Sequence, residues 1–214
     1  MKKISVIIPA YNEEESLPLL YDRMEKLMND MQNYEFEILF VNDGSKDKTL
    51  EIIKNMREKD NRICYVDFSR NFGKEIAMIA GLDYATGDCV VFMDADLQDP
   101  PELIPQLVKY WEEGYDDVYA KRRSRKGETW LKKFTSKVYY RVLQHLTKVE
   151  IQEDTGDFRL LDRRCVNALK KLRESQRNTK SMFSWIGNKK KEVLYDRDPR
   201  VAGKTKWNYI KLID

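Results

Sequence analysis

The sequence predicts an α/β protein built on one mainly parallel sheet with helices on both faces. The first observation is that short apolar runs, rich in β-branched and aromatic residues, alternate with segments whose apolar residues recur at helical spacing. This alternation is typical of a parallel sheet that is covered on both sides. The second observation is that polar residues directly follow four of the apolar runs. Ligands of such sheets bind at the carboxyl ends of the strands, so the pattern also predicts where the site lies.

The alternating pattern occupies residues 1–120. We expect strands at 4–10, 36–43, 63–69, 89–96 and 116–121. We expect helices at 17–31, 49–56, 73–85 and 101–111. The last helix begins at Pro101, and proline suits the first turn of a helix because its missing N–H would have no partner there.

The pattern changes in the second part of the chain, and we expect residues 121–214 to form the other half of the same domain. The stretch 128–146 places apolar residues along one side of a helix, with lysines around it. The stretch 154–166 is typical of a loop, a short strand and the start of a helix. Between residues 121 and 141 there are nine Lys or Arg, opposed only by Glu128. Such a run is usually a solvated helix face, and an anionic partner is the alternative.

Length and composition fit one domain with a sizeable core. The chain has 214 residues, of which 42% are hydrophobic and 11% aromatic, and its net charge of +3 favours no particular partner. Cys64, Cys89 and Cys165 lie far apart without metal-binding spacing, so we interpret them as reduced core thiols. The N-terminal apolar run is too short for a signal peptide, and no stretch approaches the ~20 apolar residues of a membrane span.

Polar side chains gather where the predicted strands end. The four groups are Tyr11 to Glu13, Asn42 to Ser45, Ser69 to Asn71, and Asp94 with Asp96. Turn and helix-cap chemistry explains any one of these groups. Because all four are expected at one edge of the sheet, together they predict a nucleotide site.

The two carboxylates of the DAD stretch predict a cation at this edge. Asp94 and Asp96 are spaced i, i+2 after a buried apolar run, and at the end of a strand they can converge on one ion. Carboxylate oxygens suit Mg²⁺ or Mn²⁺, which commonly also bind phosphate oxygens of a substrate. Such a pair occurs often by chance, and its position after the fourth strand gives it weight.

The chain resembles the family 2 glycosyltransferases with the GT-A fold, a Rossmann-like α/β architecture. The matching stretches are PAYNEE (9–14), VNDGSKDKT (41–49), SRNFGKE (69–75) and DADLQDPPE (94–102). Later stretches, RRSRKGETW, DTGDFRLLDR, SWIG and RVAGKTKW, are similar to the branch that makes polyprenyl-phosphate sugars. That branch includes bactoprenol glucosyltransferases and dolichyl-phosphate mannose synthases. The order of the motifs over nearly the whole chain is more specific than any one of them.

For the sugar donor, the resemblance implies a set of binding residues in the first half of the chain. Pro9, Tyr11 and Glu13 would line the pocket for the base and ribose, and Asp43 would hydrogen-bond the nucleobase. Asp94 would lie near the ribose and the metal. Asp96 would hold the metal together with Gln98. The cofactor would be Mg²⁺ or Mn²⁺.

For the acceptor, the resemblance implies a catalytic acid position and an anion site. Asp157 matches an acidic position near the reaction centre of the family, although it could equally cap its strand or pair with Arg159. The acceptor phosphate would be bound by Arg122, Arg125 and Arg200. Arginine suits this task because its planar fork matches phosphate oxygens.

The resemblance implies an inverting transfer of a sugar from a nucleoside diphosphate sugar, with UDP-glucose favoured, to polyprenyl (undecaprenyl) phosphate at the cytoplasmic face of the membrane. The basic run 121–141 and the tail would contact an anionic membrane surface, and the stretch 206–214 would lead into transmembrane helices beyond it. No nucleic acid partner is expected, and the oligomeric state stays open. A soluble family 2 enzyme acting on a sugar or peptide hydroxyl, and a non-catalytic nucleotide-sugar-binding module, are the alternatives.

Overall fold

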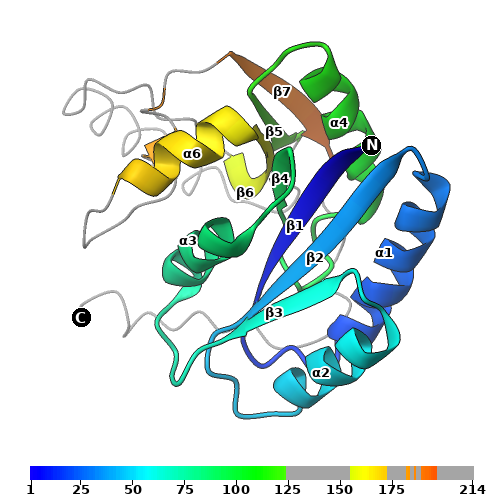
Figure 1. The fold of residues 1–214 in the computed structure, drawn as a ribbon, viewed down its shortest axis with the longest axis vertical. Coiled ribbons are helices and arrows are strands. Elements are labelled where there is room, and N and C mark those ends of the chain that lie inside the picture. Colours follow the sequence, from blue (N-terminus) through cyan, green and yellow to red (C-terminus); the bar gives the residue numbers. More distant parts are fainter. Residues whose placement is uncertain (124–154, 173–181, 184–185, 187–188, 197–214) are drawn as a thin grey trace, which may run out of the picture.

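The computed structural model describes residues 1–123, 155–172, 182–183, 186 and 189–196. The strands are β1 (Lys2–Ala10), β2 (Tyr34–Asn42), β3 (Ile63–Asp67), β4 (Cys89–Phe92), β5 (Asp117–Arg122), β6 (Thr155–Asp162) and β7 (Lys190–Tyr195). The helices are α1 (Leu17–Asp30), α2 (Thr49–Lys59), α3 (Lys74–Tyr84), the 3₁₀ helix η1 (Pro101–Leu103), α4 (Ile104–Glu112) and α6 (Arg163–Lys171). Figure 1 shows how these elements surround one central sheet.

The strands form one sheet in the order β3-β2-β1-β4-β6-β5-β7. Strands β1 to β4 pair in parallel, and β5 pairs in parallel with β7. Among the described strands only β6 runs against the others, because it pairs antiparallel with both β4 and β5. The predicted mainly parallel sheet is therefore confirmed. The direction of β6 matters for the site, since this strand begins at the edge where its parallel neighbours end.

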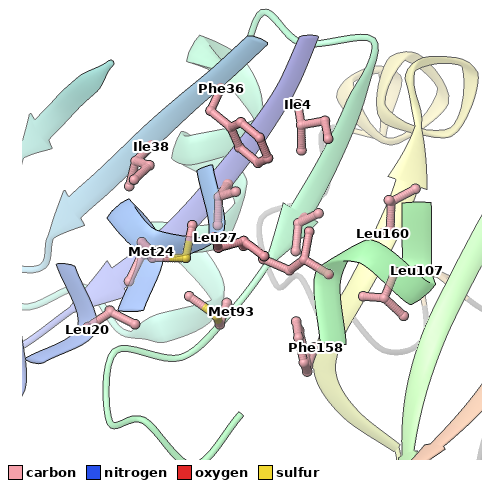
Figure 2. Close-up of a cluster of buried hydrophobic side chains, with 14 of the residues drawn as sticks. Ile4, Leu20, Met24, Leu27, Phe36, Ile38, Met93, Leu107, Phe158 and Leu160 are labelled. Carbon is pink, nitrogen blue, oxygen red and sulfur yellow. The ribbon is translucent and has the colours of Figure 1, made fainter. Parts of the chain in front are cut away.

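Helices cover both faces of the sheet, as the sequence predicted. Alternate strand residues face a large core that also contains buried residues of α1, α2 and α4. The intervening strand residues face a second core together with α3 and α6. Figure 2 shows the first core, where Met24 and Leu27 of α1, Phe36 and Ile38 of β2, and Leu107 of α4 lie around the sheet. Because the central strands are buried on both faces, their sequences are nearly continuous runs of apolar residues.

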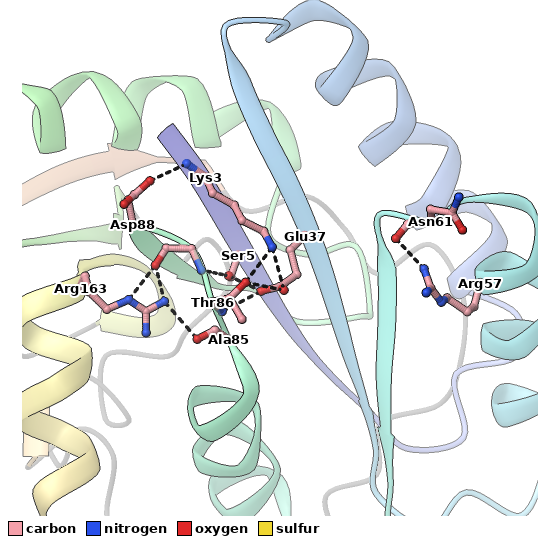
Figure 3. A network of polar contacts seen from close by, with 10 residues as sticks. Lys3, Ser5, Glu37, Arg57, Asn61, Ala85, Thr86, Asp88 and Arg163 are labelled. Atoms are coloured by element: carbon pink, nitrogen blue, oxygen red, sulfur yellow. Dashed lines mark hydrogen bonds and ion pairs between the residues drawn. The ribbon is translucent and has the colours of Figure 1, made fainter. Parts of the chain in front are cut away.

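A buried polar network stabilises the edge of the sheet opposite the polar strand ends (Figure 3). Glu37 Oε2 accepts hydrogen bonds from the Ser5 hydroxyl at 2.5 Å and the Thr86 amide at 3.0 Å, and Oε1 accepts from the Thr86 hydroxyl at 2.8 Å and Lys3 Nζ at 3.2 Å. Burial raises the pKa of Glu37, but these hydrogen bonds outweigh it and leave the pKa below its ordinary value. The network therefore holds the β1–β2 pair and the turn before β4 through an ionised carboxylate.

Several local expectations are corrected. The 154–166 stretch was expected to open with a loop, but β6 already begins at Thr155 because it pairs with β5 from that residue. The helix expected from Pro101 starts as the 3₁₀ turn η1 and becomes α4 at Ile104. Cys89 and Cys165 are buried thiols as expected, whereas Cys64 is only half-buried. In the described part of the chain, no helix is both long and apolar enough to cross a bilayer.

Candidate active site

A pocket of about 320 Å³ opens at the edge where the parallel strands end. It is lined by Pro9, Ala10, Tyr11, Glu13, Asp43, Asn71, Gly73, Lys74, Asp94, Ala95 and Asp96. Pro9 and Ala10 end β1, Lys74 begins α3, and the other lining residues follow β1, β2, β3 or β4. The convergence of polar strand ends predicted from the sequence is therefore confirmed. All five of the predicted nucleotide-binding residues, together with Asp96, line this pocket.

The loops after β1 and β2 are tied to each other by side-chain hydrogen bonds. The amide of Asn12 donates to Ser45 Oγ at 3.0 Å, and Asn12 Oδ1 accepts from the Lys46 amide at 2.8 Å. The amide of Glu13 donates to Thr49 Oγ1 at 2.7 Å. Asn12 has a φ of 52°, a conformation that asparagine tolerates better than most residues. These bonds fix the two loops that form one side of the pocket.

Asp43 anchors the loop after β3. Its carboxylate accepts hydrogen bonds from the Phe72 amide at 2.7 Å, the Gly73 amide at 2.9 Å and Asn71 Nδ2 at 3.0 Å. The residue is only 3% exposed. Asp43 was predicted to bond the nucleobase; in the structure its carboxylate positions the turn 71–73 at the pocket wall.

Gly44 allows the loops after β2 and β3 to touch. Its φ is +64°, and a Cβ at this position would lie 2.3 Å from the carbonyl carbon of Arg70 and 2.6 Å from the amide nitrogen of Asn71. Backbone atoms cannot move aside as a flexible side chain can, so only glycine fits. The glycine of the VNDGS stretch thus has a packing role beside the pocket.

The loop after β4 turns sharply and carries the two acidic residues of the DAD stretch. Asp96 is buried, and its Oδ1 accepts a hydrogen bond from the Gln98 amide at 3.1 Å. Leu97, between Asp96 and Gln98, has a φ of 60°, which is unfavourable for a bulky side chain. Strain of this kind is often found at functional sites, where surrounding structure maintains it. Gln98, predicted as a metal ligand, contributes its backbone to this turn and is not among the residues that line the pocket.

Asp157 lies at the same edge because β6 is antiparallel. The pairing of β4 with β6 joins Val91 to Leu160 and Phe92 to Arg159. Continuing this register by two residues brings Asp94 level with Asp157. A strand that ran the other way would have placed Asp157 at the far end of the sheet.

Lys74 joins the two carboxylates. Its Nζ lies 2.5 Å from Asp94 Oδ1 and 2.6 Å from Asp157 Oδ2. Burial lowers the pKa of Lys74, but the charges of Asp94 and Asp157 outweigh that effect and raise it above its ordinary value. The lysine is therefore fully charged at neutral pH. Arg159, the other residue considered as a partner of Asp157, forms a buried ion pair with Asp117 at 3.1 Å.

The three arginines predicted to bind the acceptor phosphate have different outcomes. Arg122 ends β5 and is half-buried beside the Tyr195 hydroxyl, which donates to Asp99 Oδ1 at 2.7 Å. Arg122 is not among the residues that line the pocket. Arg125 and Arg200 lie outside the described residues, as do most of the basic run 121–141 and the stretch 206–214.

The donor set of the pocket fits a divalent metal that is bound partly by its substrate. No group of three or more His, Cys, Asp or Glu within the described ranges could hold a metal by itself. Asp94 and Asp96, two positions apart in the chain, nevertheless both line the pocket. Mg²⁺ typically binds through one or two protein carboxylates and completes its shell with phosphate oxygens and water. The chemistry of these residues therefore suits Mg²⁺ or Mn²⁺ brought with a diphosphate.

Asn71 was among the polar residues expected at the end of the third strand, whereas Gly73 and Lys74 of the pocket lining were not singled out. Asn71 and Gly73 belong to the SRNFGKE stretch, and the resemblance of that stretch gave no role to individual residues. Lys74 follows them at the start of α3 and provides the charge between Asp94 and Asp157. The sequence did contain a sign of the role of Lys74, because a lysine in the first turn of a helix opposes the helix dipole. A cation at that position therefore needs an acidic partner.

Comparison with known proteins identifies the family. The sequence model of Glycosyl transferase family 2 matches residues 5–169, more than half of the chain. The chain is 52% identical, over 98% of its length, to the uncharacterized glycosyltransferase sll0501 of Synechocystis sp., of which it covers 66%. It is 43% identical, over 98% of its length, to the bactoprenol glucosyl transferase of Shigella phage SfX, of which it covers 68%. The chain therefore belongs to glycosyl transferase family 2, and it spans about two thirds of the length of these relatives.

A solved structure agrees on the fold. Glucosyl-3-phosphoglycerate synthase from Mycobacterium tuberculosis, in complex with Mn²⁺, uridine diphosphate and phosphoglyceric acid, superposes with a TM-score of 0.60. The alignment covers 94% of this chain and 72% of that one, at 20% identity. At this identity the likeness concerns the fold alone, and the predicted α/β GT-A fold is confirmed.

Proposed function

We propose that the protein transfers a hexose, with glucose favoured, from a nucleoside diphosphate sugar to polyprenyl phosphate. The single observation that carries the proposal is the acidic pocket at the carboxyl edge of a family 2 fold, lined by every predicted nucleotide-binding residue. The name of the phage relative supports glucose as the sugar and a bactoprenol acceptor. UDP-glucose is the donor that we favour.

The donor would occupy the pocket, and residues 1–120 would supply its binding half. Tyr11 and Glu13 come from the loop after β1 and would border the base and ribose with Pro9. Asp43 would bond the nucleobase or hold the turn 71–73 against it. Because these loops are fixed by hydrogen bonds before any ligand arrives, little ordering is needed on binding.

A divalent ion would be held by Asp96, with Asp94 beside it. Mg²⁺ or Mn²⁺ would offset the charge of the donor diphosphate and stabilise it as a leaving group. The buried position of Asp96 and its hydrogen bond from the Gln98 amide aim this carboxylate before the ion binds.

Attack by the acceptor phosphate requires correct positioning of the two substrates more than it requires a strong base. A phosphate monoester carries close to two negative charges at neutral pH, since its second pKa is about 6. Its oxygen can attack the anomeric carbon directly while the bond from that carbon to the diphosphate breaks, which inverts the configuration. The protein then has to bring two anions together and exclude water, and such electrostatic positioning accounts for much of enzymatic rate enhancement. Asp157 would orient the acceptor, and Arg122, Arg125 and Arg200 would complete its anion site in residues 121–214.

The acceptor also decides between this proposal and its alternatives. A polyprenyl acceptor brings the site to an anionic membrane surface at its cytoplasmic face, which the basic run 121–141 would contact. A family 2 enzyme acting on a sugar or peptide hydroxyl would need Asp157 as a base instead. A binding module without turnover would retain the pocket and transfer nothing.

Transfer from radiolabelled UDP-glucose tests the proposal, with undecaprenyl phosphate, free sugars and peptides as separate acceptors and Mn²⁺ or Mg²⁺ present. We expect label in the lipid extract only with undecaprenyl phosphate, and loss of transfer when the metal is chelated. Labelled sugar or peptide in place of labelled lipid would establish the second function. If the protein binds nucleotides but forms no product with any of a panel of UDP- and GDP-sugars, the result would support the non-catalytic binding module.

A further inference from the structure

The pocket has a strong imbalance of charge that the proposed chemistry must overcome. Its lining contains four carboxylates, those of Glu13, Asp43, Asp94 and Asp96. Among the described residues that line it, Lys74 is the single Lys or Arg. A phosphate group that entered such a pocket would meet mostly like charge, and like charges at close range in a partly desolvated site repel strongly. A metal ion removes part of this repulsion, and Lys74 is the protein's own cation at this place.

The position of Lys74 is fixed from two sides. Asp94 belongs to the loop after β4, and Asp157 lies near the start of β6, so the two ion pairs of 2.5 and 2.6 Å join strands that flank the pocket. An ammonium group has three donors, and these two contacts use two of them. The side chain keeps 40% of its surface exposed, whereas Asp157 keeps 15%. The lysine is therefore a cation that two ion pairs hold at the pocket wall.

The helix that carries Lys74 adds to the positive potential. Lys74 is the first residue of α3, and no side chain caps this helix at Gly73. The N-terminus of a helix has a partial positive charge, which favours anions. A lysine at this end is unfavourable for the helix itself, so its placement needs another explanation than helix stability.

We propose that Lys74 is a phosphate-binding residue of the transfer site, and that Asp94 and Asp157 act on it as positioning residues. Its ammonium group takes a phosphate oxygen that belongs either to the donor diphosphate or to the acceptor monophosphate, which are chemically alike at this point. Asp157 then serves to aim a cation rather than to remove a proton. The inference rests on the proposed function, which supplies both phosphates.

The test compares Lys74→Gln with Lys74→Arg and with Lys54→Gln. A glutamine amide can still donate to both carboxylates but carries no charge, whereas arginine keeps the charge. Lys54 is an exposed lysine of α2, away from the pocket, and provides the matched control. The readouts are the Kd of UDP and of uridine by calorimetry, with GDP and guanosine in their place if the wild type prefers them, and the KM for undecaprenyl phosphate.

If the donor supplies the phosphate, Lys74→Gln weakens UDP binding by about 10- to 100-fold and leaves uridine binding unchanged, since a hydrogen bond to a charged group is lost. If the acceptor supplies it, the KM for undecaprenyl phosphate rises by a similar factor while UDP binding is unchanged. In either case Lys74→Arg retains most of the affinity and Lys54→Gln behaves as wild type. A folded Lys74→Gln protein with both constants within about twofold of wild type would overturn the inference.

A second measurement is made on the wild-type protein. UDP or undecaprenyl phosphate should shift the ¹⁵Nζ resonance of the Lys74 ammonium group in NMR spectra, assigned with Lys74→Arg, and uridine should not. An unchanged Lys74 resonance with each phosphate ligand would also overturn the inference. A wild-type protein that binds no nucleotide and transfers no sugar would instead contradict the proposed function, so the two failures are distinguishable.

Discussion

Replacing Asp43 with alanine should both destabilise the protein and weaken nucleotide binding. The carboxylate accepts three hydrogen bonds, of 2.7 to 3.0 Å, from the turn 71–73. A hydrogen bond to a charged group contributes about 1.5–3 kcal/mol, but Asn71 and Phe72 are exposed and water can replace part of what they lose. We therefore expect the free energy of unfolding to fall by about 2–4 kcal/mol, less than three full bonds would give.

Urea unfolding measures this loss, with the slope compared between proteins to verify that the unfolded states are alike. Asp22→Ala on the exposed side of α1 is the control, and surface changes of this kind shift stability by less than about 0.5 kcal/mol. The affinity for UDP should fall as well, because Asn71 and Gly73 line the pocket. An Asp43→Ala protein that unfolds with the same free energy as wild type and binds UDP equally well would show that Asp43 does not hold the turn 71–73.

The remaining predictions concern packing, pH and the metal. Gly44→Ala should lower the midpoint of thermal unfolding far more than Gly114→Ala, because both glycines have positive φ but only at Gly44 does a new Cβ meet backbone atoms; equal effects would mean that φ alone matters. The lowered pKa of Glu37 gives stability that is complete above its unfolded-state value of 4.5 and is lost as the pH falls through the folded-state pKa. Glu37→Gln should therefore lose less stability than wild type between about pH 5 and about pH 3 in urea titrations, and parallel losses would contradict the ionised network. Asp96→Ala should abolish metal-dependent sugar transfer with an unchanged far-UV circular dichroism spectrum, and near-normal turnover by the folded variant would remove Asp96 from the metal site.

The sheet and the place of the site could be predicted from the sequence because both follow from local patterns. The alternation of apolar runs and helical spacing is visible without any tertiary contact, and Asp94 and Asp96 come directly after a buried run. The carboxyl ends of parallel strands share one edge, so the polar groups that follow them had to meet.

The contacts between these groups could not be predicted, since they depend on which strands become neighbours. The Lys74–Asp157 pair joins residues 83 positions apart, and it requires that β6 is inserted antiparallel beside β4. Glu37 likewise appears as an unexceptional acid in an apolar run, and only the packing of β1 against β2 gives it Ser5 and Lys3 as partners. The close approach that requires Gly44 is also a property of two loops and not of either one.

A crystal structure of the protein with UDP and Mn²⁺ tests the central claim most directly. We expect the nucleotide to occupy the pocket at the carboxyl edge, with its base beside Tyr11 and Asp43 and with Asp96 holding the Mn²⁺ ion near the diphosphate. In the same crystals soaked with UDP-glucose, we expect the glucose to lie on the side of the pocket formed by Asp94 and Lys74. A nucleotide bound elsewhere on the chain, or a diphosphate whose metal contacts neither Asp94 nor Asp96, would contradict the central claim.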